Sequence, residues 1–157
     1  MTENADAHEA EPTLAVALEV EHRQIDAGIE AYAKGGEVSD VLDAVTALRR
    51  HIWIEEEMVF PRLVERGLQM PVFVMEREHG ELWNLMDQLA RQLDEEPANT
   101  TETCQQMLAL LDAHNSKEEP ILYPHVDEAL GVDEAQRLRE FMETGTLPAG
   151  WVCKRAG

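Results

Sequence analysis

Residues 114–124 read HNSKEEPILYP, and this stretch is the most informative part of the chain because it places ionisable side chains on the buried face of a helical pattern. Counted in alternating steps of three and four residues, the core-facing positions of the segment include His114 and Glu118 among apolar residues. A carboxylate buried without a partner is strongly destabilising. The stretch therefore predicts a long helix whose central core positions face a common partner.

A second stretch, HIWIEEEMVFP at residues 51–61, repeats the first. Both read His-x3-Glu-Glu-x3-Phe/Tyr-Pro with the same spacing, and EVEH ending at His22 recurs as EREH ending at His79. The chain therefore uses one pair of helices twice. Two similar pairs packed around a pseudo-twofold axis bring six polar residues to one level of the core. These candidate ligands are His22, His51, Glu55, His79, His114 and Glu118.

Clusters of glycine, proline and polar residues separate four periodic segments, and short connections between them favour antiparallel neighbours. The sequence predicts an all-α fold, an antiparallel up-down-up-down four-helix bundle with a short extra C-terminal helix. The expected helices are residues 12–34, 39–66 with Ser39 at the N-cap, 71–93, a fourth around the opening stretch, and 133–144. The last of these and the tail are expected to pack as a lid, although the tail from Leu147 also fits a disordered interaction segment.

The expected domain organisation follows from these boundaries. Residues 1–11 form a flexible acidic leader, residues 12–131 the bundle, and residues 132–157 the short C-terminal helix and tail. With 157 residues, the chain is long enough for one domain with a sizeable core.

The spacing of the six candidate ligands suits metal binding. Residues four apart on a helix lie about 40° apart around its axis, so His51 and Glu55 share a face, as do His114 and Glu118. Imidazole and carboxylate together suit iron, manganese or zinc, and two shared carboxylates among four histidines favour two adjacent ions over one. The alternative is a metal-free network of hydrogen-bonded histidine and glutamate side chains.

On these residues the chain resembles the hemerythrin or HHE cation-binding family over roughly residues 13–129. The resemblance rests on the six candidate ligands together with Phe60-Pro61 and Tyr123-Pro124. It implies an antiparallel bundle that holds two iron ions, a di-iron centre with bridging carboxylates and an oxo or hydroxo bridge. Oxygen-carrying hemerythrins have a fifth histidine one turn before the position of His79, where this chain has Met75. That departure argues against simple reversible O2 carriage.

Other polar residues are weaker candidates. Glu19 and Glu76 each stand three residues before a candidate histidine, as in ferritin-like sites, but we expect roles outside the ligand set. For Glu21, Glu56, Glu78 and Glu119 a charged outer face is expected, with hydrogen bonds to imidazole as the alternative. His125 and His8 are not expected to be ligands. Trp53, Phe60, Trp83 and Tyr123 are expected at helix interfaces, where one of them could border a ligand tunnel.

Composition limits the remaining functions. The chain has 32 acidic and 13 basic residues, a net charge of −19, which disfavours nucleic acid and anionic membranes as partners. The sequence shows no secretory signal, and its two cysteines form neither a disulfide framework nor a CxxC motif. We therefore expect a cytoplasmic protein, with an oligomeric state that the sequence does not define.

The leading hypothesis is a protein that binds O2 or a related small oxidant, NO or peroxide, for sensing, storage or scavenging. One alternative is a di-iron oxidoreductase that reduces peroxide or NO or oxidises ferrous iron. Another is an iron-handling or regulatory module whose fold depends on metal occupancy.

Overall fold

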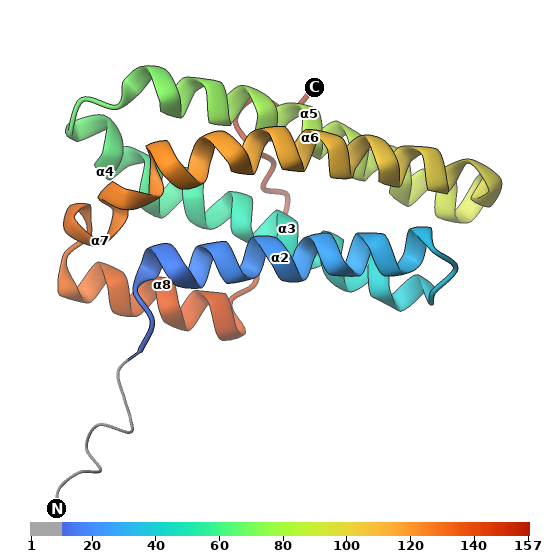
Figure 1. Cartoon of the computed structure of the whole chain (residues 1–157), viewed down its shortest axis with the longest axis horizontal. Helices are drawn as coiled ribbons and strands as arrows, with labels where there is room; N and C mark the ends of the chain where they lie inside the picture. The colour runs from blue at the N-terminus through green and yellow to red at the C-terminus, as the bar shows by residue number, and fades with distance from the viewer. Residues whose placement is uncertain (1–10) are drawn as a thin grey trace, which may run out of the picture.

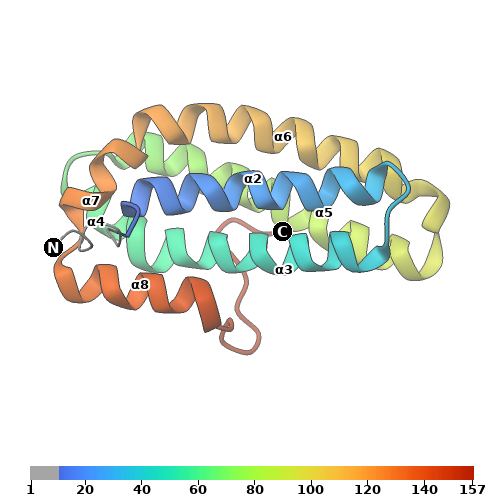
Figure 2. The same cartoon turned by 60° about the horizontal axis from the view of Figure 1, so that its bottom comes forward.

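The computed structural model describes residues 11–157, which form helices and turns without a strand. Four long helices lie side by side along the long axis of the molecule (Figures 1 and 2). They are α2 (Leu14–Ala33), α3 (Val38–Ile54), α5 (Gln69–Glu95) and α6 (Thr100–Ile121). The predicted all-α class is confirmed. His8 and residues 1–10 of the predicted leader lie outside the described residues.

The path of the chain brings both halves of the repeat into one core. In Figure 1 the ribbon runs lengthwise in α2, returns in α3, runs forward again in α5 and returns in α6. Helix α2 packs against both α3 and α6, and α5 packs against α6. Within residues 11–157, every helix is too short or too polar to span a bilayer.

Each half of the repeat becomes irregular just after its shared spacing of histidine and glutamate. Helix α3 continues through a π-helical segment, Glu55–Val59, into α4 (Phe60–Glu65), and the Phe60 N–H donates to the Glu55 carbonyl. In the second half Pro120 lies inside α6, which is followed by a 3-10 segment, Tyr123–His125, and by α7 (Val126–Ala129). Proline removes one helical N–H and π-helical turns widen a helix, so both features re-aim the side chains that follow.

The predicted N-cap of the second helix is wrong by two residues. Glu37, rather than Ser39, is the N-cap of α3, and its N–H donates to Asp40 at 3.0 Å. The predicted single helix 39–66 is also divided by the π-helical segment. Local hydrogen bonding of the turn thus overrides the general preference for serine at this position.

Helix α8 (Val132–Thr144) lies beside α3 on the flank of the bundle (Figure 2) and confirms the predicted short C-terminal helix. Phe141 of α8 stacks on Trp53 of α3 with ring centroids 4.2 Å apart. Asp127 of α7 accepts the backbone N–H groups of Leu14 and Ala15 and so caps α2. These contacts hold α8 against α3 and α7 against the start of α2, at the end of the bundle where α2 begins.

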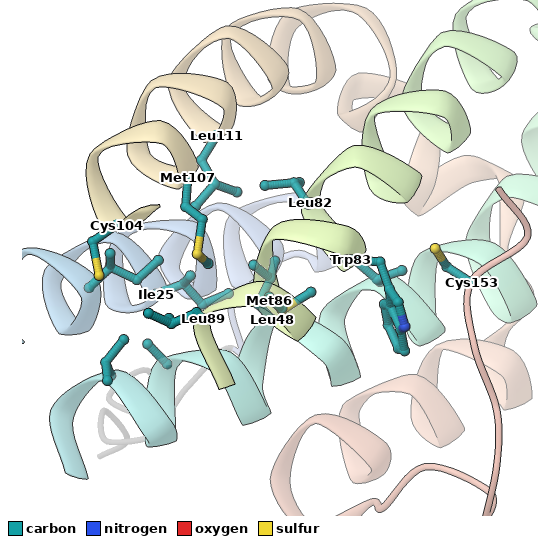
Figure 3. Packing of buried hydrophobic residues seen from close by; sticks show 14 residues of the cluster. Ile25, Leu48, Leu82, Trp83, Met86, Leu89, Cys104, Met107, Leu111 and Cys153 are labelled. Atoms are coloured by element: carbon teal, nitrogen blue, oxygen red, sulfur yellow. The ribbon is translucent and has the colours of Figure 1, made fainter. Parts of the chain in front are cut away.

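Two apolar clusters lie on either side of that polar level. One includes Ile25, Leu48, Met86 and Met107, which point toward one another between the helices (Figure 3). The other gathers residues such as Leu18, Phe60 and Tyr123 at the end near α4 and α7. The six candidate ligands therefore lie between two water-excluding layers.

The C-terminal tail is ordered against the bundle, so its interpretation as a disordered segment is wrong. Cys153 is 2% exposed and belongs to the same apolar cluster as Trp83, with Leu147 and Trp151 packed beside it. Figure 3 shows the Cys153 sulfur on the bundle side of the tail. The tail is ordered because these apolar side chains pack against the bundle, and the composition of the tail did not predict that packing.

Candidate metal centre

The structure brings all six predicted ligand residues together, and none is more than 4% exposed. They come from the four long helices and from the π-helical segment that continues α3. His22 lies on α2, His51 on α3 with Glu55 directly after it, His79 on α5, and His114 and Glu118 on α6. Helical spacing places these side chains at one level, as the internal repeat predicts.

Each glutamate lies between one histidine of its own helix and one histidine from the other half. The two carboxylate oxygens of Glu55 lie 3.1 Å from His51 Nε2 and 3.0 Å from His79 Nε2. Oε1 of Glu118 lies 3.3 Å from His22 Nε2 and 3.4 Å from His114 Nε2. The carboxylates therefore join the two halves of the repeat.

The ligand atoms form two overlapping groups that could each hold a cation. Both groups contain Glu55 and Glu118; one adds His22 and His51, and the other adds His79 and His114. Within each group the four ligand atoms lie within 4.8 Å of one another. Two cation positions that share two carboxylates are thus laid out side by side.

Four further glutamates, the outer carboxylates, each accept a hydrogen bond from a histidine Nδ1 at 2.8 Å. The pairs are Glu21 with His51, Glu56 with His79, Glu78 with His114 and Glu119 with His22. Each pair joins neighbouring helices, and together the pairs form a closed ring around the bundle. The expected charged outer face for these glutamates is wrong, because their side chains reach across helix interfaces.

The hydrogen bonds of this ring bear on whether the six residues fit a metal, because they fix which nitrogen of each imidazole faces the core. A neutral histidine that donates Nδ1–H to a carboxylate leaves Nε2 as an acceptor, the form that binds metal. His22 Nε2 and His51 Nε2 face each other at 3.0 Å, and two acceptors at that distance need a cation or a proton between them. Among the described residues, the fully buried carboxylate oxygens of Glu118 have no hydrogen-bond partner. A cation would satisfy both features, so the residues fit.

The pattern of the hemerythrin HHE cation binding domain matches residues 8–126 of the chain, which include all six of these side chains. The chain belongs to this hemerythrin family. No curated protein and no solved structure gives a significant match to the chain. Cation binding is therefore shown at the level of the family, and the paired clusters identify where this hemerythrin domain would bind the cations.

Protonation in the metal-free hemerythrin domain follows the same contacts. Burial alone would lower the pKa of His114, but the carboxylates of Glu118 and Glu78 outweigh it and raise the pKa to about 10. Burial opposes ionisation of Glu55 too, yet His51 and His79 hold the pKa of its carboxyl well below the usual range. Protons thus occupy positions that cations would otherwise take.

Sequence reasoning placed Tyr123 at a helix interface and missed its hydroxyl. That hydroxyl lies 2.6 Å from Glu55 Oε2, 2.9 Å from His22 Nε2 and 3.1 Å from His51 Nε2. The repeat offered a signal, because Phe60 occupies the matching position and stacks on His79 as Tyr123 stacks on His22. Only the second half carries an oxygen at this place, so the two cation positions of the hemerythrin domain differ.

The weaker candidates stay outside the paired clusters of residues 11–157. Glu19 lies beside Arg23 at 4.0 Å, and Glu76 lies 3.6 Å from Lys154 of the tail. His125 is exposed in its 3-10 segment. Buried Met75 fills the place of the fifth histidine of oxygen-carrying hemerythrins with apolar volume.

A small cavity of about 10 Å³ adjoins the four histidines, which is room for about one water molecule. Apolar residues such as Ile25 and Leu82 line most of it, and Asn115 adds a polar group. Oδ1 of Asn115 is buried and has no hydrogen-bond partner among the described residues. A small ligand beside the histidines would meet one polar side chain in an apolar setting.

Proposed function

We propose that this hemerythrin domain is a non-haem di-iron protein that binds O2 or a related small oxidant, NO or peroxide, for sensing, storage or scavenging. The observation that carries the proposal is the pair of overlapping clusters that share Glu55 and Glu118. Imidazole and carboxylate ligands permit iron, and the family resemblance favours it over zinc or manganese. The up-down-up-down arrangement of the four long helices is part of the same proposal.

The residues divide into two sets with shared members. His22 and His51 would hold one ion, and His79 and His114 the other. The carboxylates of Glu55 and Glu118 would be shared, because each already lies between histidines of both halves. When bound, the two iron ions would supply electrons and an open position for the oxidant.

The remaining side chains control the surroundings of that position. The outer carboxylates hold each imidazole by its Nδ1–H and so keep Nε2 directed at the core. The apolar layers exclude water, which strengthens electrostatic interactions between the buried groups. The hydroxyl of Tyr123 donates to Glu55 and holds one carboxylate oxygen on the side of His51.

The small cavity favours small ligands over larger substrates. Its volume of about 10 Å³ is room for about one water molecule, so a diatomic molecule or peroxide needs a small shift of the lining side chains, whereas an organic substrate would have to displace core side chains. The described residues around the histidines offer no side chain placed to act as a nucleophile on such a ligand. This arrangement supports a binding role.

Metal analysis joined to optical spectroscopy tests the proposal. Protein purified without added metal is analysed for iron, reduced, and its spectrum is recorded before and after exposure to air. We expect two irons per chain and a new absorption band in air that disappears when the oxidant is removed. Iron-free protein that takes up no ferrous iron would contradict the proposal. Repeated consumption of peroxide or NO in the presence of a reductant would instead identify a di-iron oxidoreductase.

A further inference from the structure

The C-terminal tail, residues 147–157, lies outside the region that matches the hemerythrin pattern, yet it contacts one of the outer carboxylates beside the candidate metal centre. The Trp151 Nε1–H donates to Glu57 at 3.1 Å, and the Gly157 N–H donates to Asn84 at 3.1 Å. Between these anchors, Cys153 is buried against the bundle. The tail is therefore fastened to the π-helical segment after α3 and to α5.

Glu56 connects the tail to a candidate ligand. One of its oxygens, Oε1, accepts the backbone N–H of Lys154 at 2.9 Å, and the other, Oε2, accepts Nδ1–H of His79 at 2.8 Å. The tail thus lies one carboxylate away from the imidazole. Glu56 accepts both hydrogen bonds at the same time, so the tail can orient the histidine through this one side chain.

The other outer carboxylates are held differently. Glu21 lies 3.5 Å from Arg50, and Glu78 accepts from Lys117, so long charged side chains of the bundle hold these two. Glu119 is 30% exposed beside His22. Glu56 alone among these four accepts a backbone N–H from the tail, and a backbone donor loses less freedom than a lysine or arginine side chain. The His79 end of the centre therefore has a support that the His22 end lacks.

Helix α5 is shaped for the tail at the residue that follows His79. A Cβ atom on Gly80 would lie 2.3 Å from the Arg155 carbonyl oxygen, well inside van der Waals contact. Glycine lets the two backbones approach closely where any side chain would push the tail away. The seat for the tail is thus built beside the histidine that the tail supports.

We propose that the C-terminal tail is a positioning segment of the metal centre, whose Lys154 N–H fixes Glu56 and through it His79. This inference rests on the proposed metal centre. Loss of the hydrogen bond frees Glu56 to turn toward water, so His79 loses the partner that directs its Nε2 inward. Such partners of ligating histidines typically contribute about 10–100-fold to metal affinity. The ion beside His79 and His114 is affected, and the ion beside His22 and His51 is not.

A matched pair of substitutions at Lys154 isolates the backbone N–H. The Ala156 N–H bonds to the Cys153 carbonyl at 3.2 Å, which makes Lys154 the second residue of a turn, where proline is favoured. Lys154→Pro removes the N–H donor, whereas Lys154→Ala keeps it. Both variants lose the 3.6 Å contact between Lys154 Nζ and Glu76, so that contact cancels in the comparison.

The first measurement is competition for ferrous iron with a chelator under anaerobic conditions. We expect Lys154→Pro to bind one of its two ions about 10–100-fold more weakly than Lys154→Ala, with the second ion unchanged. Equal affinities in the two variants would overturn the inference. Equal weakening of both ions in Lys154→Pro would also overturn it, because that result indicates a general loss of stability.

A second background tests whether the effect passes through Glu56. In Glu56→Gln an NH2 donor replaces one of the two oxygens that separately accept from Lys154 and His79, so the side chain in place can accept from only one of them. Lys154→Pro should then add no further loss of affinity, since coupled residues are not additive. A full additional loss in the double variant would show that the tail acts by another route.

A readout without metal separates this inference from the proposed function. In metal-free protein, solvent exchange of the His79 Nδ1 proton, followed by nitrogen-15 NMR, should be faster in Lys154→Pro than in Lys154→Ala. Equal exchange rates would contradict the positioning role even if the iron results for the wild-type chain support a di-iron centre. Conversely, a wild-type chain that binds no iron would contradict the proposed function. The exchange rates would still decide whether the tail positions His79.

Discussion

The hydroxyl of Tyr123 donates a 2.6 Å hydrogen bond to Glu55, and this contact joins the two halves of the internal repeat. It also breaks their symmetry, because the matching residue in the first half is Phe60. The phenol remains protonated near neutral pH, since burial and the charges of Glu118 and Glu55 raise the pKa of Tyr123 well above its ordinary value. The second half therefore contributes a proton donor that the first half lacks.

Tyr123→Phe should make the two cation positions more alike. Removing a hydrogen bond to a charged group is expected to destabilise the metal-free protein by about 1.5–3 kcal/mol in urea unfolding. Iron affinity should fall at the position of His22 and His51. Tyr32→Phe is the control, because it removes the 3.0 Å contact of a hydroxyl with Thr100 far from the ligands. Unchanged iron binding in Tyr123→Phe together with unchanged stability would contradict this role.

Glu78→Gln should loosen the ion held by His114. Glu78 accepts Nδ1–H of His114 at 2.8 Å. Burial opposes its ionisation, but His114 and Lys117 lower the pKa of its carboxyl to about 2. In competition with a chelator, we expect the variant to bind one of its two irons about 10–100-fold more weakly than the wild-type protein. Glu81→Gln, an exposed change on the same helix, should leave both affinities unchanged; an equal loss in the two variants would exclude a local effect.

Stability of the metal-free protein should fall as pH rises. The pKa of His114 is about 10 in the folded chain against an ordinary value of 6.5, and the pKa values of His51 and His79 are raised as well. Protonation therefore stabilises the fold fully below about pH 6.5, and that contribution disappears as pH approaches 10. A pKa that is higher by one in the folded chain than in the unfolded chain corresponds to about 1.4 kcal/mol of stability.

Thermal unfolding with a chelator present measures this dependence. The midpoint should decrease between pH 7 and pH 10, and His114→Gln should flatten the decrease. Iron-loaded protein should show a smaller decrease, because the cations replace the protons. A midpoint that rises over this interval in metal-free protein would refute the assignment of buried, protonated histidines.

Asn115→Ile should alter the choice of small ligand. The matching residue in the first half is Ile52, which is fully buried, so the change copies a side chain that the bundle already accommodates. Loss of the amide removes the one polar side chain, besides the histidines, that lines the cavity. Affinity for peroxide should fall by about 0.5–1.5 kcal/mol, the size of one hydrogen bond, with a smaller change for NO. Equal changes for both ligands, measured by stopped-flow absorbance, would count against Asn115 as a selective contact.

Helical periodicity was sufficient to predict the all-α class, and the repeat of histidine and glutamate spacing was sufficient to predict the six clustered residues. Periodicity places His51 and Glu55 on one helix face, and the second copy places His114 and Glu118 opposite them. Hydrogen bonds from the outer carboxylates to imidazole were only the alternative prediction, because Glu21 and Glu119 lie next to ligands in sequence and a charged outer face was favoured for them. Their partners are histidines of neighbouring helices, which a single-helix argument does not consider.

The hydroxyl contacts of Tyr123 and the hydrogen bonds of the tail were not predicted, for a different reason. The position of Tyr123 depends on Pro120 and on the 3-10 segment that follows, where helical periodicity no longer applies. The tail is held by backbone groups such as the Lys154 N–H, and these carry no sequence signal. The one residue in the sequence that reflects the packed tail is Gly80, because a glycine inside α5 permits the close approach of Arg155.

Anomalous X-ray scattering at the iron edge, recorded from crystals of iron-loaded protein, is the sharpest test of the di-iron centre. Two iron peaks are expected inside the bundle, one among His22, His51 and the shared glutamates, the other among His79, His114 and the same two glutamates. A single peak, or peaks confined to the acidic surface, would contradict a centre built from these six side chains.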